Sequence, residues 1–390
     1  MPLGLYISVP FCRTKCTYCN FASDVFSRVV FEKYIARLCD EIQHAPETAQ
    51  QTGALFERSI DTIYLGGGTP TLLDVAQLER VFVTIQQKFN VQPDAEITAE
   101  CAPGTLTDSV LEILRSCGVN RVSLGVQSFV DHEAASVGRL HKRETVIADI
   151  ARLRAAGITN INVDLIAGLP HQTLESWNYS LNELIETGVP HASVYMLEID
   201  EDSRLGRELI AGGQKYHAHF VPDEDLTADL YETACERLND AGIRQYEISN
   251  FARSGFESIH NLKYWKRQTY LGFGVDAHSM LVTEEGAVRF ANPESLEDYL
   301  GHVPATRTVV SRDQALEECL FLGLRQTAGV DLRLISGSFG TDATSKLSEV
   351  INELTRDGLL ELDSDNIRLS PKGRLLSNEV FQKFISIPAA

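Results

Sequence analysis

Six short apolar segments alternate with amphipathic helical patterns across the first half of the chain, and this alternation limits the fold more than any other feature. The apolar segments are residues 5–9, 62–65, 96–100, 121–126, 160–166 and 192–197. Helical patterns lie between them, near residues 29–45, 74–89, 107–117, 143–156 and 173–187. Each helix is long enough to cross between parallel strands. The pattern predicts an α/β fold with a parallel sheet, either doubly wound or a partial (β/α)6 barrel.

Polar residues and glycines lie at the carboxyl ends of these predicted strands, where parallel sheets bind ligands. Cys12 follows the first strand and the 66–68 glycines follow the second. Glu100 ends the third strand, Gln127 follows the fourth, and Asp164 lies late in the fifth. One such end would mean little, because turns are rich in glycine and polar residues. Five of them in one sheet predict a shared ligand site.

The second half of the chain is less regular and then forms a separate unit. It contains a helical pattern near 225–241, the segment HNLKYW at 260–265, and the glycine-rich LGFGVDAHS at 271–279. Helices at 313–326 and 343–357, a hairpin turning near 363–366 and a helix from Lys372 then follow in the order of a winged helix. We therefore predict a barrel over 1–200, an extension carrying HNLKYW over 201–305, and a small winged-helix-like α+β domain over 306–390.

Composition excludes several classes of partner. The formal net charge is −19 and no basic run occurs, whereas nucleic acids and anionic membrane surfaces bind to positive surfaces. The opening MPLGLYISVPFC lacks the basic and long apolar segments of a signal peptide, and no apolar run is long enough for a membrane span. We expect a cytoplasmic protein whose eight cysteines remain thiols.

Three cysteines are close together, Cys12, Cys16 and Cys19, in the sequence FCRTKCTYCNF. A structural zinc site requires four ligands close together in the sequence, and a four-cysteine iron–sulfur cluster requires a fourth nearby cysteine. Three thiolates on a four-iron cluster leave one iron without a protein ligand, and that iron can chelate S-adenosylmethionine (SAM). The spacing therefore favours a [4Fe–4S] cluster with SAM over a structural zinc site or a chance group of cysteines.

The motif, the preceding YISVPF and the following GGGTP resemble the radical SAM superfamily. More narrowly, the chain resembles the group that contains oxygen-independent coproporphyrinogen III dehydrogenase and the HemW heme chaperones. The resemblance covers nearly the whole chain, including the C-terminal unit. It implies a partial barrel, a [4Fe–4S] cluster held by Cys12, Cys16 and Cys19, and bound SAM.

The resemblance also assigns residues to SAM. In GGGTP, Gly67, Gly68 and Thr69 match the motif that contacts the amino group of SAM. Further matches to residues that pack beside SAM or contact it are Tyr6, Tyr18, Glu100, Gln127, Arg139 and Asp164. The last three of these match residues around a second SAM in the dehydrogenase. Carboxylates suit an ammonium group or a ribose diol, and arginine suits a carboxylate.

Two features separate the dehydrogenases from the chaperones. The dehydrogenases usually carry a fourth cysteine two residues after the third, and here that position is Phe21, preceded by Asn20 where HemW has aspartate. HNLKYW matches the HNxxYW motif associated with heme binding in HemW, and His260 is predicted as an axial heme ligand. Ser8 replaces the group's usual histidine, which weakens the dehydrogenase interpretation further.

The favoured function is a non-catalytic heme chaperone that binds heme, the cluster and SAM and transfers heme to an acceptor protein. The sequence does not name that acceptor, and an electron donor such as a flavodoxin or ferredoxin would be needed to reduce the cluster. Two alternatives remain. One is an oxygen-independent coproporphyrinogen III oxidase (dehydrogenase) of porphyrin biosynthesis, which would release carbon dioxide from propionate side chains. The other is a radical SAM enzyme acting on a different substrate.

Overall fold

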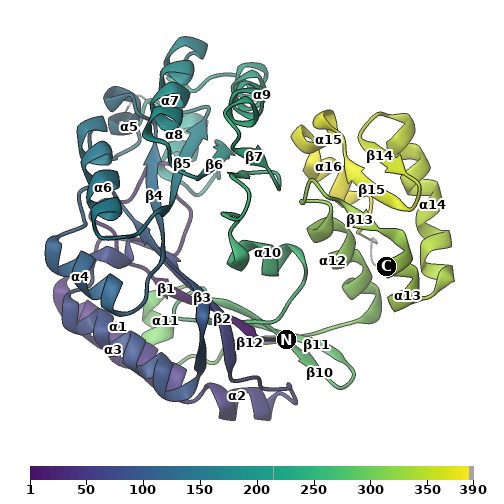
Figure 1. Ribbon diagram of the computed structural model, residues 1–390, viewed down its shortest axis with the longest axis horizontal. Helices are drawn as coiled ribbons and strands as arrows, with labels where there is room; N and C mark the ends of the chain where they lie inside the picture. The colour runs from purple at the N-terminus through teal and green to yellow at the C-terminus, as the bar shows by residue number, and fades with distance from the viewer. Residues whose placement is uncertain (214, 386–390) are drawn as a thin grey trace.

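The computed structural model describes residues 1–213 and 215–385 and contains the six predicted strand–helix repeats (Figure 1). The parallel strands are β1 (Leu3–Val9), β2 (Ser59–Gly67), β3 (Asn90–Cys101), β4 (Arg121–Gln127), β5 (Asn160–Ala167) and β6 (His191–Met196). They pair with one another in sequence order, from β1 beside β2 to β5 beside β6. A doubly wound sheet would reverse that order at a switch point. The predicted α/β partial barrel is therefore confirmed, and the doubly wound alternative is excluded.

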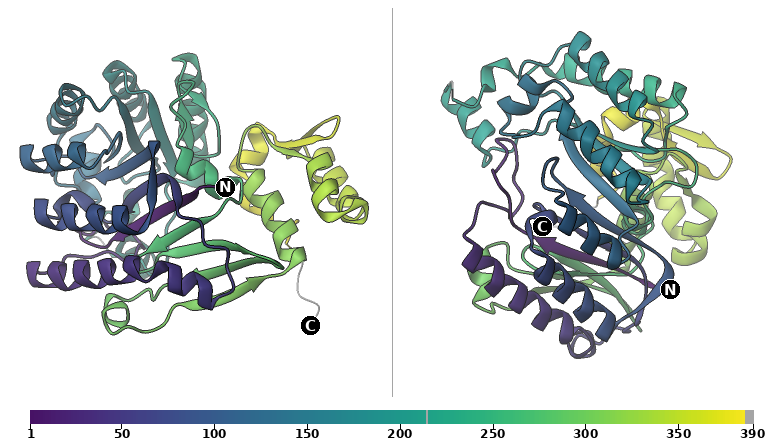
Figure 2. Two further views of the ribbon diagram at one scale, coloured as in Figure 1. Left: turned by 60° about the horizontal axis from the view of Figure 1, so that its bottom comes forward. Right: turned by 60° about the vertical axis from the view of Figure 1, so that its left-hand side comes forward.

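The helices of the repeats cover the outer face of the curved sheet (Figure 2). They are α1 (Arg28–Gln43), α2 (Ala45–Gln51), α3 (Val75–Lys88), α4 (Asp108–Ser116), α5 (Asp131–Ser136), α6 (Arg143–Ala155) and α7 (Leu174–Thr187). Local sequence sets where they begin, since Asp74 caps α3 and Thr173 caps α7, each in a capping box. Neither these nor any other helix in the described part of the chain has the length and apolar character to cross a bilayer.

Alternate residues of each strand divide between the two faces of the sheet. On β1, Leu5 and Ile7 are completely buried in the main hydrophobic cluster, which also contains Leu38 of α1. The intervening Tyr6 lies on the opposite face, where its ring stacks with that of Tyr64 on β2. Because side chains alternate along a strand, the outer face packs against the helices and the inner face is available to bind ligands.

The sheet continues beyond both edges of the six parallel strands. After α8 (Arg204–Ala211) and α9 (Glu224–Asp240), β7 (Arg244–Gln245) and β8 (Asn250–Ala252) pair antiparallel beyond β6. On the other edge β9 (Tyr270–Phe273) pairs parallel with β1, and the sheet then continues through β10 (His278–Thr283), β11 (Gly286–Ala291) and β12 (Thr306–Val310). The short helices α10 (Ile259–Trp265) and α11 (Leu296–Leu300) connect these strands. The three-part division of the chain remains a prediction.

The C-terminal residues form a small α+β unit with its own core (Figure 1). Its elements are α12 (Arg312–Gly323), β13 (Val330–Asp331), α13 (Leu332–Phe339), α14 (Thr341–Arg356), β14 (Leu360–Asp363), β15 (Asn366–Leu369), α15 (Pro371–Leu375) and α16 (Ser377–Gln382). Leu320, Ile367 and Val380 are buried together in this core. The predicted order of helices and hairpin is confirmed. The sequence did not indicate α13, a short helix that contains one glycine and two serines.

Candidate functional site

The loop after β1 carries the three clustered cysteines and is held by backbone hydrogen bonds to other parts of the barrel. The Cys12 N–H donates to the Asp24 carbonyl at 3.0 Å and closes the base of the loop. The Thr17 N–H donates to the Val137 carbonyl at 3.2 Å, and the Thr17 carbonyl accepts from the Leu205 N–H of α8 at 2.8 Å. The shape of the loop is therefore set by the protein's own contacts.

All three cysteines of this loop are free thiols in an enclosed position. Cys16 is buried, and Cys12 and Cys19 are partly buried. Burial raises the pKa of the Cys12 and Cys19 thiols, although a hydrogen bond with Ser23 opposes each shift. Iron–sulfur clusters are held by thiolates. Cluster binding here would therefore release protons, as expected for thiol ligands that are protonated beforehand.

Arg139 places a positive charge beside this loop. Its Nη1 lies 3.6 Å from the Cys16 sulfur, and its Nη2 donates to the Gly125 carbonyl on β4. Gly125 leaves room for this contact, because a Cβ there would lie 3.2 Å from both Arg139 and the side-chain amide of Gln127. Tyr18 lies close to Cys16 as well, and its enclosure raises the pKa of the phenol. The guanidinium therefore lies where its positive charge can offset the negative charge of a bound thiolate cluster.

The arrangement of the thiols fits a cluster better than a single metal ion. In the ranges that the structure describes, no three His, Cys, Asp or Glu side chains lie close enough together to hold one ion. A closed zinc site needs four such ligands around one ion. The thiolates of a four-iron cluster bind different irons and are therefore spaced more widely. The donor set and the nearby Arg139 thus favour the predicted [4Fe–4S] cluster.

The glycine turn after β2 lies directly against the cysteine loop. The Gly68 N–H donates to the Val9 carbonyl at 2.9 Å, and the Thr69 N–H donates to the Phe11 carbonyl at 2.7 Å. A Cβ on Gly68 would lie 2.7 Å from that Phe11 oxygen. Gly67 has a φ of +97°, which strongly favours glycine. These contacts therefore hold the backbone of the glycine turn directly beside the cysteine loop.

Glu100, near the end of β3, is a partly exposed carboxylate inside the barrel and beside this turn. Gly66 leaves space for it, because a Cβ there would lie 2.9 Å from Glu100 Oε1. Enclosure by the protein and, next, the charge of Asp164 raise the pKa of Glu100 to about 7. Hydrogen bonds from the Tyr64 hydroxyl, at 2.9 Å, and from the Gly67 N–H oppose this rise. Such a carboxylate suits an ammonium ligand, because the positive charge of the ligand favours the ionised form of Glu100.

Asp164 on β5 lies near Glu100, and Gln127 ends the intervening strand β4. Asp164 accepts hydrogen bonds from the Ser123 hydroxyl at 3.1 Å and from the Asn162 amide at 2.6 Å, and enclosure raises the pKa of its carboxyl. Gln127 ends β4 with a φ of 71°, an uncommon conformation for a residue other than glycine. Such backbone strain is often found at binding sites. Asp164 is therefore a second carboxylate available to a cationic ligand.

The structure brings the predicted cluster and SAM residues together at one end of the barrel. The hydroxyl of Tyr6 would lie 3.4 Å from a Cβ on Gly67, and the Tyr6 side chain is close to Glu100. Ser8, at the position of the group's usual histidine, is buried beside the same turn. Only His260, of the predicted site residues, lies elsewhere.

His260 lies in α10, near the amino-terminal ends of the strands. Its side chain is 1% exposed, with Nδ1 2.9 Å from the Thr62 hydroxyl and Nε2 2.8 Å from the Tyr264 hydroxyl. Its backbone N–H donates to the Glu96 carboxylate at 2.9 Å. Burial lowers the pKa of His260 to about 3. Both ring nitrogens are engaged, so heme ligation by His260 remains a prediction that requires these contacts to break.

Sequence reasoning missed two residues on the inner face of the sheet. Tyr64 connects the two predicted regions, because its hydroxyl donates to Glu100 and its ring stacks with that of His260 at 5.3 Å. Arg121, at the start of β4, is 2% exposed, and its Nε has no hydrogen-bond partner. Its charge opposes the rise in the pKa of both Glu100 and Asp164. The alternation of side chains along β2 and β4 was the signal that could have found them.

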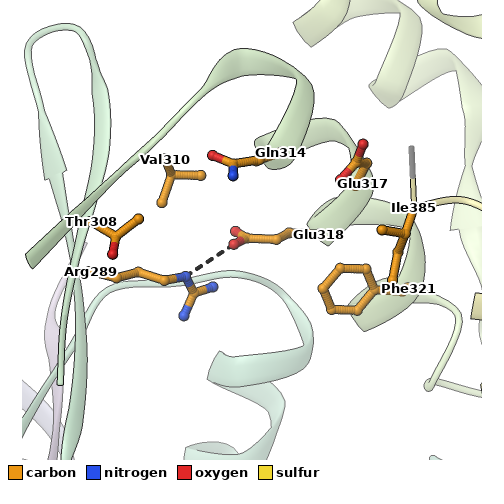
Figure 3. Close-up of a pocket in the computed structure, with 8 residues that line it drawn as sticks. All are labelled: Arg289, Thr308, Val310, Gln314, Glu317, Glu318, Phe321 and Ile385. Carbon is orange, nitrogen blue, oxygen red and sulfur yellow. Dashed lines mark hydrogen bonds and ion pairs between the residues drawn. The ribbon is translucent and has the colours of Figure 1, made fainter. Parts of the chain in front are cut away.

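The C-terminal unit contacts the end of α10. Glu318 of α12 forms ion pairs with Arg267 at 2.6 Å and with Arg289 at 3.0 Å, and Arg325 lies 4.3 Å from the centre of the Trp265 ring. Figure 3 shows a pocket beside the Arg289–Glu318 pair, lined by Arg289, Thr308, Val310, Gln314, Glu317, Glu318, Phe321 and Ile385. No predicted site residue lines this pocket. It is therefore separate from the cysteine loop and the glycine turn.

Comparisons with known proteins agree with this architecture. Residues 6–184 match the Radical SAM superfamily, and residues 310–376 match the HemN C-terminal domain. The structure of coproporphyrinogen III oxidase (HemN) from Escherichia coli is similar with a TM-score of 0.84 at 27% identity, covering 98% of this chain and 90% of that chain. The similarity therefore includes the C-terminal unit.

Several relatives are similar over their full length. The chain is 34% identical over 389 residues to the heme chaperone HemW of Lactococcus lactis, which covers 98% of this chain and 97% of the relative. It is 35% identical over 388 residues to the heme chaperone HemW of Bacillus subtilis, covering 97% of this chain and 98% of the relative. The heme chaperone HemW of Escherichia coli is 29% identical over 391 residues. The chain therefore belongs to the HemW family of the radical SAM superfamily.

Proposed function

We propose that this protein is a heme chaperone that carries a [4Fe–4S] cluster and SAM and transfers heme to an acceptor protein. The observation that carries the proposal is the full-length similarity to proteins named heme chaperone HemW. The position of the dehydrogenases' usual fourth cysteine supports it, because Phe21 stands there and is 63% exposed. An exposed phenylalanine supplies no ligand at this position.

In this proposal the three cysteines of the loop hold the cluster and leave one iron open to SAM. The glycine turn and Glu100 bind the amino end of SAM, and Arg139 offsets the negative charge at Cys16. The other proposed SAM contacts are Tyr6, Tyr18, Gln127 and Asp164. When bound, the cluster supplies the electron that can cleave the sulfonium of SAM.

A second candidate is oxygen-independent coproporphyrinogen III oxidase activity. The observation that favours it is the similarity to the HemN structure, with a TM-score of 0.84 over 98% of this chain. The sequence identity to HemN is 27%, below the 34% and 35% to two HemW proteins. The chaperone is therefore our first proposal, and the oxidase is the alternative to be tested against it.

The proposal names three partners and a compartment. Heme is the cargo, a hemoprotein that lacks heme is the acceptor, and a flavodoxin or ferredoxin is the electron donor. We place the protein in the cytoplasm. Its net charge of −19 disfavours binding to nucleic acid.

Heme titration of the anaerobically reconstituted protein tests the proposal. A saturable Soret band is expected, followed by loss of that band and gain of the acceptor's spectrum when an apo-hemoprotein is added. The same protein without added heme provides the control for the cluster's own absorption. Failure to form a saturable heme complex would contradict the proposal.

A further inference from the structure

Three histidines pack around Phe220 and a fourth, His132, packs against one of them. We call these five residues the imidazole cluster: His132, His171, His217, His219 and Phe220. The Nε2 of His171 lies 2.9 Å from the Nδ1 of His217. The centre of the His171 ring lies 4.1 Å from that of Phe220 and 4.5 Å from that of His132. The His219 ring packs against Phe220 at 4.1 Å. Phe220 is 47% exposed, so solvent and ligands can reach the cluster.

The imidazole cluster lies at the carboxyl ends of the parallel strands, where barrels bind their ligands. His132 lies in α5 after β4, His171 in the loop after β5, and His217 in the segment that follows β6 and α8. The cysteine loop, the glycine turn and Glu100 occupy the corresponding positions on β1, β2 and β3. Helix α8 packs against the helical turn Ala218–Phe220, which carries two members of this cluster. The imidazole cluster therefore continues the rim that holds the candidate SAM site.

The backbone holds the two joined histidines in place. The His171 N–H donates to the Phe220 carbonyl at 2.9 Å. The buried Gln172 side chain accepts from the Gly168 N–H at 2.6 Å and donates to the Ile166 carbonyl at 3.1 Å. His171 and His217 have φ values of 70° and 63°, which persist in residues other than glycine only where the surrounding structure enforces them. The pair is thus positioned by the fold.

The joined imidazoles are suited to bind a metal in their neutral form. Enclosure and the neighbouring histidines, His132 first, lower the pKa of His171, which keeps its ring neutral near pH 7. One of the two joined nitrogens accepts the other's N–H. The accepting nitrogen carries a lone pair, and a metal ion can bind that lone pair in place of the hydrogen bond. The other ring keeps its N–H, so no proton is released.

The imidazole cluster offers too few ligands for a free metal ion but enough for the iron of heme. Across the described residues, no three His, Cys, Asp or Glu side chains are arranged to hold one ion, whereas free zinc needs three or four protein ligands. The iron of heme is held by four porphyrin nitrogens and takes only one or two axial ligands from the protein. The exposed ring of Phe220 also offers a flat apolar surface to the porphyrin.

We propose that the imidazole cluster is a heme-docking site, in which His171 or His217 binds the heme iron and Phe220 contacts the porphyrin. This inference rests on the proposed chaperone function and identifies the surface that performs it. His260, by contrast, is 1% exposed with both ring nitrogens engaged. A partly exposed site also lets an acceptor reach the heme.

The test is a heme titration of the full-length, anaerobically reconstituted protein carrying both His171→Asn and His217→Asn. Asparagine tolerates the left-handed backbone of these positions and is a poor iron ligand. His44→Asn is the matched control, because this ring is 62% exposed at the end of α1. We expect heme binding to weaken by at least about tenfold in the double variant. We also expect a shifted Soret band that free imidazole partly restores, with unchanged iron–sulfur content and an unchanged control.

Each other outcome decides against the docking site in a distinguishable way. A double variant with the wild-type heme affinity and Soret band overturns the docking site and leaves the proposed function intact. Loss of Zn²⁺ binding with unchanged heme binding assigns the imidazole cluster to free metal ions and also overturns it. Absence of heme binding in the wild-type protein overturns the chaperone function and the docking site together. If the double variant loses its circular dichroism, the single variant His217→Asn decides by the same criteria.

Discussion

Replacing Tyr64 with phenylalanine tests the electrostatics of the candidate SAM site, because it removes one hydroxyl and keeps the ring. That hydroxyl donates to Glu100 at 2.9 Å, whereas the ring stacks with Tyr6 and His260. The other groups that act on the Glu100 carboxyl are Asp164, the Gly67 N–H and Arg121, with Tyr6 close by on β1. The substitution therefore removes one hydrogen bond and leaves the other groups that shift the pKa of Glu100 in place.

The size of the effect follows from the strength of that hydrogen bond. A hydrogen bond to a charged group contributes about 1.5–3 kcal/mol, and one pKa unit corresponds to about 1.4 kcal/mol. The variant should therefore raise the pKa of Glu100 from about 7 by about one to two units. For a rise of about 1.5 units, the ionised fraction at about pH 7.5 falls from about three quarters to about one tenth. If SAM binds the ionised carboxylate, its dissociation constant rises roughly eightfold there and hardly at all near pH 9.5.

Calorimetric titration with SAM between about pH 6.5 and 9.5 measures this difference. Wild-type affinity should increase as the pH rises through about 7, and the variant should show the same increase at higher pH. Tyr179→Phe is the control, since this tyrosine is 43% exposed on α7. A loss of affinity that is equal at every pH would refute the electrostatic argument and assign Tyr64 a packing role. Unchanged affinity throughout would remove Glu100 from the site.

Replacing all three loop cysteines with alanine should abolish the bound iron and the absorption near about 400 nm, whereas Cys39→Ala on α1 should retain both; four irons per chain in the triple variant would be the contrary result. Glu100→Gln should stabilise the SAM-free protein by about 3 kcal/mol at about pH 8 and little at about pH 4. The pKa of Glu100 is raised from 4.5 to about 7, so the stability that Glu100 contributes to the wild-type fold is fully present below about pH 4.5 and is lost as the pH rises through about 7. Urea unfolding measures this stability, and a difference between the two proteins that does not change with pH would count against the argument. His260→Ala should lower the free energy of unfolding by about 2–3 kcal/mol, because it leaves the Thr62 and Tyr264 hydroxyls without their partner; an unchanged thermal midpoint would contradict the contacts of α10.

The barrel and its ligand-binding end could be predicted from the sequence because their determinants are local. The alternation of strands and helices depends on periodicity within each segment, and a parallel sheet places the carboxyl ends of its strands at one edge. The glycine turn could be placed beside the cysteines for the same reason. The hydrogen bonds from the Gly68 N–H to the Val9 carbonyl and from the Thr69 N–H to the Phe11 carbonyl agree with this placement.

The rest depends on contacts between distant segments, which periodicity does not report. β9 pairs with β1 although Gly4 and Tyr270 are far apart in the sequence, and α10 packs against the amino-terminal ends of the strands. The HNLKYW motif indicated a heme ligand, yet the neighbours of His260 become visible only in the folded chain. The approach of His171 to His217 likewise requires two loops to meet.

The most direct test of the central claim compares heme transfer with decarboxylation in one anaerobic preparation. The reconstituted protein is given SAM, a reductant and coproporphyrinogen III, and in parallel it is loaded with heme and mixed with an apo-hemoprotein. The account predicts transfer of heme to the acceptor and no decarboxylation of the porphyrinogen. Formation of protoporphyrinogen over several turnovers, without heme transfer, would contradict it.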